Sequence, residues 1–363
     1  MEAWEGDGVR RLKIGSIEIG PGCPCLIVAE IGVNFNGDVD LATRMIRVAA
    51  QCGAGAVKFQ RRNIDAILTR AAQEAPYLNE RSFGATYGAH RRALEFPDAA
   101  WPMLRTVANV SGVLLFATPY DPDSAKFLGR LGVPCVKVAS CDVTNPPLLE
   151  AVGALGVPVI MSTGMSTEEE IDRAVRTIWR YTQELVLMNC VSTYPSEAKD
   201  LNLRYMLKLA KRYRCIVGHS GHERGIQTTL AAVTLGAAVV ERHLTLDRSS
   251  RGPDHAASLE PNGLTRLVRD IRRIEEALIE RPKVVLPSER AIRDRLAKSV
   301  VAARLIRRGE LVERAALGFK GPGTGLPPYR SENLVGRTAL QDIVPDTLIS
   351  EAMLSPDRST RSE

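Results

Sequence analysis

With 363 residues, of which 45% are hydrophobic and 25% are charged, the chain suits a barrel of about 250 residues with a small appended domain. Its formal net charge of +6 at pH 7 is spread over helices and loops without an aromatic-interleaved stripe, which favours small anionic ligands and argues against a nucleic-acid partner. No apolar stretch approaches the ~20 residues of a membrane span and the first residues lack a signal-peptide pattern, so we expect a cytoplasmic protein without a membrane partner.

Short apolar runs, each followed by a turn, recur eight times. They cover residues 26–31, 56–59, 113–117, 133–138, 157–161, 185–190, 215–218 and 239–242. Amphipathic helical stretches lie between most of them, for example at residues 39–52, 124–131, 167–181 and 225–235. Continuous apolar strands that alternate with helices are typical of a parallel sheet buried on both faces. Eight such units favour a closed (β/α)8 TIM barrel over an open doubly wound sheet, since no glycine-rich nucleotide fingerprint follows the first run.

A longer segment separates the second and third apolar runs. Residues 61–101 exceed a simple strand-to-helix connection and contain the glycine- and aromatic-rich stretch Ser82-Phe-Gly-Ala-Thr-Tyr-Gly-Ala-His90. Long connections at the mouth of a barrel commonly cover the ligand site, so we expect this segment to do so. His90 could touch a substrate, but a loop histidine without a visible partner is more often structural or solvated.

The barrel pattern ends in a charged segment that contains Pro282 and Pro287. Beyond it, short apolar pieces and the stretch Gly318-Phe-Lys-Gly-Pro-Gly-Thr-Gly325 indicate a small β-rich domain. The predicted organisation is a TIM-barrel domain over residues 1–285, a linker over 286–296, a β-rich domain over 297–355 and a disordered tail over 356–363.

Polar side chains follow each of the eight predicted strands. The C-terminal ends of parallel barrel strands converge on one mouth, so these side chains are expected to face a common pocket. In chain order they are Glu30 with Asn34, Lys58 with Gln60, Thr118, Lys137 with Ser140 and Asp142, Ser162, Ser192 with Tyr194, Ser220 with His222, and His243 with Asp254.

Two histidines and two lysines are the most informative members of this set. His222 and His243 are expected to project toward one point, as imidazole ligands of a divalent metal or as an acid/base pair. Lys58 and Lys137, flanked by hydroxyls, suit a ligand that carries both a phosphate and a carboxylate. Lysines at the barrel rim and a Schiff-base lysine are the alternatives.

Three carboxylates belong to the same predicted rim. Glu30, Asp142 and Asp254 could bind sugar hydroxyls, complete a metal shell or move protons. Together with the histidines and lysines, they predict a polar, metal-capable pocket for a small anionic molecule and a polyol.

A series of ordered motifs covers nearly the whole chain. In the barrel they are Ala29-Glu30-Ile31-Gly32-Val-Asn34, Val57-Lys58-Phe59-Gln60, Lys137-Val-Ala-Ser140, Ser162-Thr-Gly-Met165, Cys190-Val-Ser192-Thr-Tyr194-Pro195, Gly218-His-Ser220-Gly-His222 and Glu241-Arg-His243. They continue through Gly252-Pro-Asp254-His-Ala-Ala-Ser258 and Lys320-Gly-Pro-Gly-Thr-Gly325. Together these motifs resemble the sialic acid (N-acetylneuraminate) synthase family. The C-terminal domain resembles the antifreeze-like (SAF) domain of that family, which closes the partner's barrel in a domain-swapped homodimer.

The resemblance implies a condensation of phosphoenolpyruvate with an aldose such as N-acetylmannosamine, which gives a 2-keto-3-deoxy sugar acid and phosphate. It assigns the phosphate and carboxylate of phosphoenolpyruvate to Lys58, Thr118, Lys137, Ser140, Ser162, Ser192 and Ser220. It assigns the sugar to Gln60, Asp142, Tyr194 and Asp254, and the orientation of water or an intermediate to Glu30. It also implies that His222 and His243 bind Mn²⁺, with Mg²⁺ or Co²⁺ as alternatives, and that the metal polarises the sugar aldehyde as a Lewis acid.

Two positions depart from the family pattern. In the family, an arginine in a Lys-Arg-Pro-Gly stretch of the SAF domain contacts the N-acetyl side of the substrate, and here Gly321 occupies that position. Phe35 replaces the Asn or His expected after Asn34. A non-acetylated or phosphorylated sugar, leading to a different ulosonic acid, is therefore an alternative acceptor. A catalytically silent barrel that binds sugar or phosphate is the alternative from another class, and the retained lysine and histidine pairs argue against it.

Overall fold

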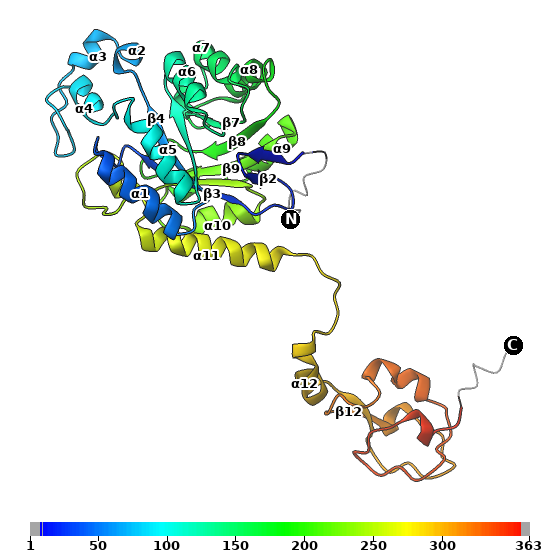
Figure 1. Ribbon diagram of the computed structural model, residues 1–363. Helices are drawn as coiled ribbons and strands as arrows, with labels where there is room; N and C mark the ends of the chain where they lie inside the picture. The colour runs from blue at the N-terminus through cyan, green and yellow to red at the C-terminus, as the bar shows by residue number, and fades with distance from the viewer. Residues whose placement is uncertain (1–7, 9, 357–363) are drawn as a thin grey trace. The chain divides into compact units, whose positions relative to one another are not determined.

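The computed structural model describes residues 8 and 10–356. The chain forms two compact units, Met1–Ile279 and Glu280–Glu363 (Figure 1). The first unit therefore ends before the predicted boundary at residue 285. The segment expected to be a linker, residues 286–296, is helical over most of its length, as α12 (Pro287–Leu296). Of the predicted tail, only Pro356 belongs to the described residues, and the rest of that prediction lies outside them.

Eight parallel strands form a closed barrel, which confirms the TIM-barrel prediction. In order around the barrel they are β10 (Val239–His243), β3 (Leu26–Gly32), β4 (Ala56–Arg61), β5 (Leu114–Pro119), β6 (Val136–Val138), β7 (Val159–Ser162), β8 (Leu185–Cys190) and β9 (Ile216–Gly221). The last strand pairs with the first, and His243 is in register with Glu30. Helices cover the outer face and side chains fill the interior, which is why the strands read as continuous apolar runs.

Helices connect the strands and follow the last one (Figure 1). They are α1 (Val39–Gln51), α5 (Ala100–Val110), α6 (Pro122–Leu131), α7 (Pro146–Gly153), α8 (Glu168–Trp179), α9 (Tyr205–Tyr213), α10 (Gln227–Thr234) and α11 (Pro261–Leu278), with short 3-10 turns η1 (Ser140–Asp142), η2 (Ala198–Asp200) and η3 (His255–Ala257). Local sequence sets several starts: Asp38 caps α1, and Thr167 with Glu170 forms a capping box on α8. No helix within the described residues is both long and apolar enough to cross a membrane.

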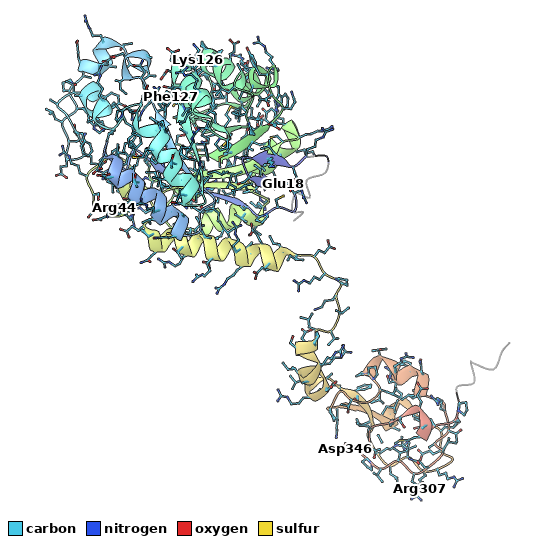
Figure 2. All side chains as sticks on the ribbon, viewed as in Figure 1. Glu18, Arg44, Lys126, Phe127, Arg307 and Asp346 are labelled. Atoms are coloured by element: carbon cyan, nitrogen blue, oxygen red, sulfur yellow. The ribbon has the colours of Figure 1, made fainter. Side chains whose placement is uncertain are left out.

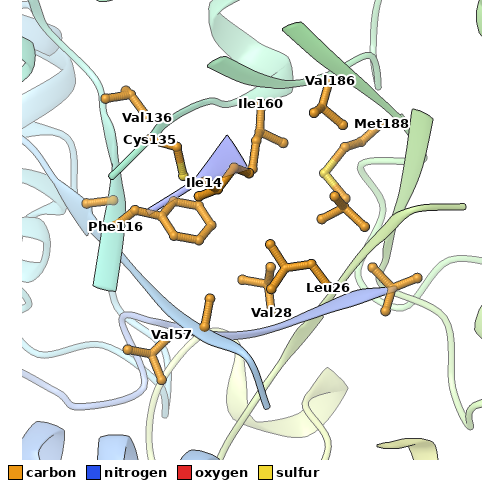
Figure 3. Close-up of a cluster of buried hydrophobic side chains, with 14 of the residues drawn as sticks. Ile14, Leu26, Val28, Val57, Phe116, Cys135, Val136, Ile160, Val186 and Met188 are labelled. Carbon is orange, nitrogen blue, oxygen red and sulfur yellow. The ribbon is translucent and has the colours of Figure 1, made fainter. Parts of the chain in front are cut away.

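A short hairpin packs against the N-terminal end of the barrel. Strands β1 (Leu12–Ile14) and β2 (Ile17–Ile19) pair antiparallel. Ile14 and Ile19 are fully buried, and Figure 3 shows Ile14 within the cluster of apolar side chains inside the barrel. The turn requires Gly15, whose φ is +57°. Strands of three residues carry too little periodicity to be recognised, so the sequence did not predict this hairpin.

The long segment after β4 folds into three short helices, α2 (Ile64–Ile67), α3 (Arg70–Glu74) and α4 (Tyr87–Ala93). His90 is buried on α4. Its Nδ1 accepts the backbone N–H of Phe83 at 3.1 Å, and its ring centroid lies 4.7 Å from that of Tyr77. These contacts give His90 a structural role within the segment.

The C-terminal unit has a small core of its own, which confirms the predicted β-rich domain. Its elements are the antiparallel pair β11 (Ser299–Ala302) and β12 (Leu317–Lys320), and the short helices η4 (Arg314–Ala316), η5 (Pro328–Leu334) and η6 (Glu351–Met353). Val300 and Ile306 are fully buried in this core. On the surface, Lys320 forms an ion pair with Asp346, which is labelled in Figure 2.

Candidate active site

Inward-facing side chains at the C-terminal ends of the strands line one cavity of about 160 Å³. Alternation along a strand places residues two apart on the same face, so that Lys58 and Gln60 of β4 both face the cavity, as do Glu241 and His243 of β10. The predicted site residues that line it are Glu30, Lys58, Gln60, Thr118, Lys137, Ser140, Ser162, Ser192, Tyr194, Ser220, His222 and His243. The fold therefore brings these separate strand ends to one place.

Four charged side chains form a buried network in the cavity. Lys58 Nζ lies 2.9 Å from Glu30 Oε2 and 3.5 Å from Glu241 Oε1. Lys137 Nζ lies 3.6 Å from Glu241 Oε2, so Glu241 stands between the two lysines. All four side chains are almost completely buried. The carboxylate of Glu241 offsets the repulsion that two buried ammonium groups would otherwise exert on each other.

Contacts within this network shift the pKa values of Lys58, Lys137 and Glu241. Burial lowers the pKa of Lys58, but the carboxylates of Glu241 and Glu30 outweigh burial and raise it. Burial lowers the pKa of Lys137 by more than Glu241 raises it, and Lys58 lowers it further. Burial would raise the pKa of Glu241, yet Lys137 and Lys58 together lower it. Lys58 and Glu241 are therefore both charged at neutral pH.

Hydroxyl groups accompany the two lysines. Lys58 Nζ donates to Thr118 Oγ1 at 3.0 Å, and Lys137 Nζ donates to Ser162 Oγ at 2.6 Å. Ser140 Oγ accepts a backbone N–H at 3.1 Å on the same side of the cavity. Ammonium and hydroxyl donors in so small a volume suit a ligand with several anionic oxygens.

His222 and His243 meet at the wall of the cavity. Their ring centroids lie 5.6 Å apart, and the ring of Tyr194 lies 4.0 Å from that of His222. His222 Nδ1 donates to the carbonyl oxygen of Val191 at 2.7 Å, because a carbonyl can only accept, and Nε2 is left with its lone pair. His243 Nδ1 lies 3.7 Å from Asp254 Oδ2, too far for a hydrogen bond, and it has no hydrogen-bond partner among the described residues.

The two imidazoles differ in their affinity for a proton. Burial lowers the pKa of His243. Burial also lowers that of His222, but its contacts with Cys190 and the Val191 carbonyl outweigh burial and raise the pKa. A metal ion at His222 would therefore have to compete with a proton for Nε2.

The histidine pair fits a divalent metal as a partial set of ligands. An imidazole whose Nδ1–H is held by a carbonyl presents Nε2 as the ligand atom, and His222 has this arrangement. Among residues 8 and 10–356, no cluster of three or more His, Cys, Asp and Glu side chains could hold a metal ion. Two protein nitrogens leave most coordination positions to water and substrate, as in catalytic rather than structural sites.

Two predicted sugar ligands, Asp142 and Asp254, do not line the cavity. Asp142 ends the 3-10 turn η1, where its carboxylate accepts a hydrogen bond from Asn145 Nδ2 at 2.9 Å. The other two residues of this turn, Ser140 and Cys141, do line the cavity. Asp254 lies next to His243, with 3.7 Å between its Oδ2 and His243 Nδ1.

Three hydrogen-bonded side chains run from Glu30 along the cavity wall. Gln60 Nε2 donates to Glu30 Oε1 at 2.8 Å, and Tyr120 Oη donates to Gln60 Oε1 at 3.3 Å. All three line the cavity, and we refer to them as the polar line. Alternating donors and acceptors of this kind suit a polyol.

The sequence reading gave no role to three other side chains of the cavity wall, Glu241, Tyr120 and Cys190. Each lies two residues from a predicted site residue, namely His243, Thr118 and Ser192. The period of two along a strand was therefore the signal that could have found them.

Comparisons with known proteins cover both units. Residues 45–283 match the NeuB family, and residues 297–355 match the SAF domain. The chain is 40% identical over 333 residues to N-acetylneuraminate-9-phosphate synthase of Homo sapiens, a match that covers 91% of this chain and 93% of that protein. It is 36% identical over 330 residues to N,N'-diacetyllegionaminic acid synthase of Campylobacter jejuni, covering 90% and 99% respectively.

Solved structures show the same architecture. A sialic acid synthetase from Leptospira borgpetersenii superposes with a TM-score of 0.68 at 35% identity, over 78% of this chain and 95% of that one. A putative spore coat polysaccharide biosynthesis protein E from Chromobacterium violaceum superposes with a TM-score of 0.71 at 25% identity, over 92% and 100%.

Proposed function

Since the chain belongs to the NeuB family and its residues 297–355 form a SAF domain, we propose that it condenses phosphoenolpyruvate with an aldose. The products are a 2-keto-3-deoxy sugar acid of the sialic acid type and inorganic phosphate. The observation that carries this proposal is the buried pair Lys58 and Lys137 next to His222 and His243 in one cavity.

The lysine pair suits the two anionic groups of phosphoenolpyruvate. One ammonium is available for the phosphate and one for the carboxylate, and Thr118 and Ser162 already bond to these ammonium groups. Ser140, Ser192 and Ser220 add hydroxyls around the same cavity. By formal charge, the two lysines and the two glutamates cancel. A polyanion therefore needs further positive charge, which a divalent ion held by the histidines would supply.

In the reaction, C3 of phosphoenolpyruvate attacks the aldehyde carbon of the open-chain sugar and forms the new C–C bond. C2 acquires oxocarbenium character, water adds to it, and phosphate leaves by cleavage of its bond to C2. We propose that Glu30 orients this water, because Lys58 and Gln60 hold its carboxylate in place. The polar line and Tyr194 would hold the sugar hydroxyls, and Asp254 would act through His243.

His222 and His243 are the residues that would hold the metal, with Mn²⁺ expected and Mg²⁺ or Co²⁺ as alternatives. When bound, the ion supplies Lewis acidity for the acceptor aldehyde and positive charge for the anionic substrate.

The acceptor and the assembly are the finer parts of the proposal. In the sialic acid synthase family, an arginine at this position contacts the N-acetyl side of the substrate, and Gly321 has no side chain to make that contact. We therefore expect N-acetylmannosamine to be a poorer acceptor than some other aldose. We also expect a cytoplasmic, domain-swapped homodimer in which residues 320–325 close the partner subunit's barrel and exclude water. Deletion of the chain beyond Pro287 should then leave a protein that turns over poorly, and sedimentation should report the loss of the dimer.

Phosphate release combined with product mass tests the reaction. The full chain is incubated with phosphoenolpyruvate, Mn²⁺ and a panel of aldoses that includes N-acetylmannosamine, mannose and their 6-phosphates. We expect phosphate only when an acceptor is present, and a product whose mass equals that of the acceptor plus pyruvic acid. Phosphate release without such a product, or inactivation by borohydride through Lys58 or Lys137, would overturn the proposal.

A further inference from the structure

The connection between β10 and α11 contains buried polar side chains that the reaction above does not use. It spans residues 244–260, and we call it the β10 loop. The buried side chains are those of Thr245, His255 and Ser258, which are 0%, 3% and 3% exposed. The same loop carries Asp254, next to His243. Buried polar groups in a loop are held by specific hydrogen bonds, so their partners show which part of the loop is fixed in place.

His255 bonds to the start of the β10 loop. Its Nδ1 lies 2.7 Å from Thr245 Oγ1, a contact that spans ten residues of the chain. The Thr245 hydroxyl donates to the carbonyl oxygen of Asp247 at 3.0 Å, and the same Oγ1 accepts the backbone N–H of Asp247 at 3.2 Å. A hydroxyl has one proton to give, so His255 Nδ1 is the donor in its contact with Thr245. The residue that follows Asp254 is therefore held in a defined orientation.

Asn36, which follows β3, lies at the other edge of the His255 ring. Asn36 Nδ2 donates to the carbonyl oxygen of Arg251 at 2.9 Å, and Asn36 Oδ1 lies 3.4 Å from His255 Nε2. Gly252 lies against the same ring: its φ is +147°, and a Cβ there would lie 2.6 Å from His255 Cδ2. Only glycine allows the backbone to approach the imidazole so closely. The ring is thus enclosed between the β10 loop and the loop that follows β3.

The end of the β10 loop is also fixed by hydrogen bonds. Ser258 Oγ donates to the carbonyl oxygen of Asp254 at 2.7 Å. Asn34 Nδ2 donates to Ser258 Oγ and to the carbonyl oxygen of Leu244, both at 2.8 Å. Asn34 is 1% exposed, so bulk water does not compete for these bonds. Asp254 is therefore held at its own carbonyl by Ser258 and through its neighbour His255 by Thr245.

The β10 loop brings Asp254 close to a buried nitrogen that lacks a partner. His243 Nδ1 has no hydrogen bond within the part of the chain that the structure describes, and Asp254 Oδ2 lies 3.7 Å from it. An imidazole that binds a metal through one ring nitrogen usually donates a hydrogen bond from the other, to a carboxylate or a carbonyl. His222 has such a partner in the carbonyl of Val191. An approach of about 0.5–1 Å by Asp254 would give His243 an equivalent partner.

Building on the proposed function, we propose that His255 is a positioning residue of the metal centre. It holds the β10 loop so that Asp254 accepts the Nδ1–H of His243 when the other nitrogen of that ring binds a divalent ion. His255 does not line the cavity, so it contacts neither the ion nor the substrates. Its effect on metal binding must therefore pass through Asp254.

The affinity for Mn²⁺ in a double-mutant cycle tests this role. The Kd of Mn²⁺ is measured without substrates, from the electron paramagnetic resonance signal of the free ion. The proteins are the wild type, Asp254→Asn, His255→Leu and the double variant. We expect each single substitution to raise the Kd by about tenfold or more, the usual effect of losing a partner that holds a metal ligand. Because His255 acts through Asp254, the double variant should bind Mn²⁺ no more weakly than Asp254→Asn alone.

Further variants separate positioning from folding. His255→Asn keeps an N–H donor near the place of Nδ1, so most of the Mn²⁺ affinity should return. Asn36→Gly removes the side chain beside His255 at a half-buried position whose φ of +53° suits glycine, and it should also raise the Kd. Asn202→Gly is the matched control, because Asn202 has a φ of +43° and lies outside the β10 loop, and its Kd should equal that of the wild type. Thermal denaturation shows whether each variant is folded.

The outcomes distinguish the positioning role from the reaction. Additive losses in the double variant, or a wild-type Kd in folded His255→Leu, would overturn the positioning role and leave the proposed function intact. Non-additive losses in a protein that condenses no aldose with phosphoenolpyruvate would support the positioning role and overturn the proposed function. A wild-type protein that binds no Mn²⁺ would overturn both the metal centre and the role of His255.

Discussion

Strand β10 carries buried charged side chains on both faces of the barrel wall, Glu241 on the inner face and Arg242 on the outer face, and the two sets of partners differ in what surrounds them. On the inner face, Glu241 lies between Lys58 and Lys137 at the edge of the cavity. On the outer face, Arg242 Nη1 lies 3.1 Å from Glu223 Oε1, and His219 Nε2 lies 3.5 Å from the same oxygen. Both sets are equally removed from water.

The difference is whether the charged side chains border an open cavity. Arg242 donates to Glu223 Oε1, to Thr229 Oγ1 at 2.7 Å, to the Gly225 carbonyl at 2.9 Å and to the Glu223 carbonyl at 2.5 Å. These partners fix the connection between β9 and α10. Lys58 Nζ contacts Thr118, Glu30 and Glu241, and Lys137 Nζ contacts Ser162 and Glu241, but both lysines also line the open cavity. Buried charge alone therefore does not identify a reactive site, whereas buried charge beside a cavity does.

The largest effect is expected at the inner histidines. His222→Ala and His243→Ala should each lower kcat/KM by at least about 1,000-fold, since Lewis-acid polarisation is worth several kcal/mol. The melting temperature should change little, because both rings line a cavity. Metal content by elemental analysis and activity after chelation complete the measurement. Full activity in both variants and in the chelated enzyme would show that the reaction needs no metal at these histidines.

Disruption of the outer cluster should affect stability instead. Arg242→Met leaves Glu223 buried and uncompensated, so the free energy of unfolding should fall by about 3–5 kcal/mol. The double variant Arg242→Met with Glu223→Met should recover much of this loss, because no buried charge is left unpaired. Urea titration measures both. A folded Arg242→Met protein of unchanged stability would show that the outer cluster contributes nothing.

The inner lysines should control substrate affinity. Lys58→Ala and Lys137→Ala should each weaken phosphoenolpyruvate by roughly 2–5 kcal/mol, the usual cost of truncating one partner of a buried charge pair. Calorimetric titration with phosphoenolpyruvate gives the Kd directly. Normal binding of phosphoenolpyruvate by both variants would place the anion site elsewhere. The buried charges on the inner face would then have a purely structural role, like those on the outer face.

Acidification should weaken the outer cluster. Burial would raise the pKa of Glu223, but the contact with His219 and the charge of Arg242 outweigh it and hold the pKa well below its usual range. A depressed carboxylate pKa stabilises the fold above the unfolded value of about 4.3, and this stability is lost as the pH falls further. Glu223→Gln should therefore be less stable than the wild type at pH 7 and lose less stability below about pH 4. Parallel stability curves for the two proteins would contradict this assignment.

The smallest effect is expected outside the barrel, at Gly321. A Cβ there would meet no heavy atom closer than 3.5 Å, so Gly321→Arg should change stability by no more than about 0.5 kcal/mol. By the family resemblance, it should raise kcat/KM for N-acetylmannosamine several-fold. Gly323→Arg is the control, since a Cβ there would lie 2.5 Å from Ala297 Cβ and should destabilise the C-terminal unit. An unchanged acceptor preference in Gly321→Arg would show that this position does not contribute to sugar recognition.

The strands and most of the cavity were predictable because their signals are local. A buried strand is an apolar run, and the polar residue that closes it stands out, as Lys58 and Lys137 do. The partners of these residues were not predictable in the same way. Glu241 lies far from both lysines along the chain, and only the closure of the barrel brings the three together.

Other features lacked a clear local signal in the sequence. Arg242 and Glu241 are neighbours in sequence but face opposite sides of the wall, and composition does not distinguish the two faces. Asp142 remains a predicted sugar ligand, although it is not among the residues that line the cavity. The helix within the segment 286–296 was not predicted from its charge, although Pro287 at its start and Glu289 in the first turn are features of a helix N-terminus.

The seam between β3 and β10 determines when this site can first exist during synthesis. Glu30 becomes the neighbour of His243 only when these two strands pair. Asn34 Nδ2 then donates a hydrogen bond to the carbonyl oxygen of Leu244, which lies 210 residues later in the chain. At about 5–20 residues per second, a ribosome needs roughly 10–40 s to translate that interval. Until then the strand that carries Glu30 is an unpaired edge, open to contact with other nascent chains. The residues that give the mature protein its chemistry thus also define its most vulnerable interval on the ribosome.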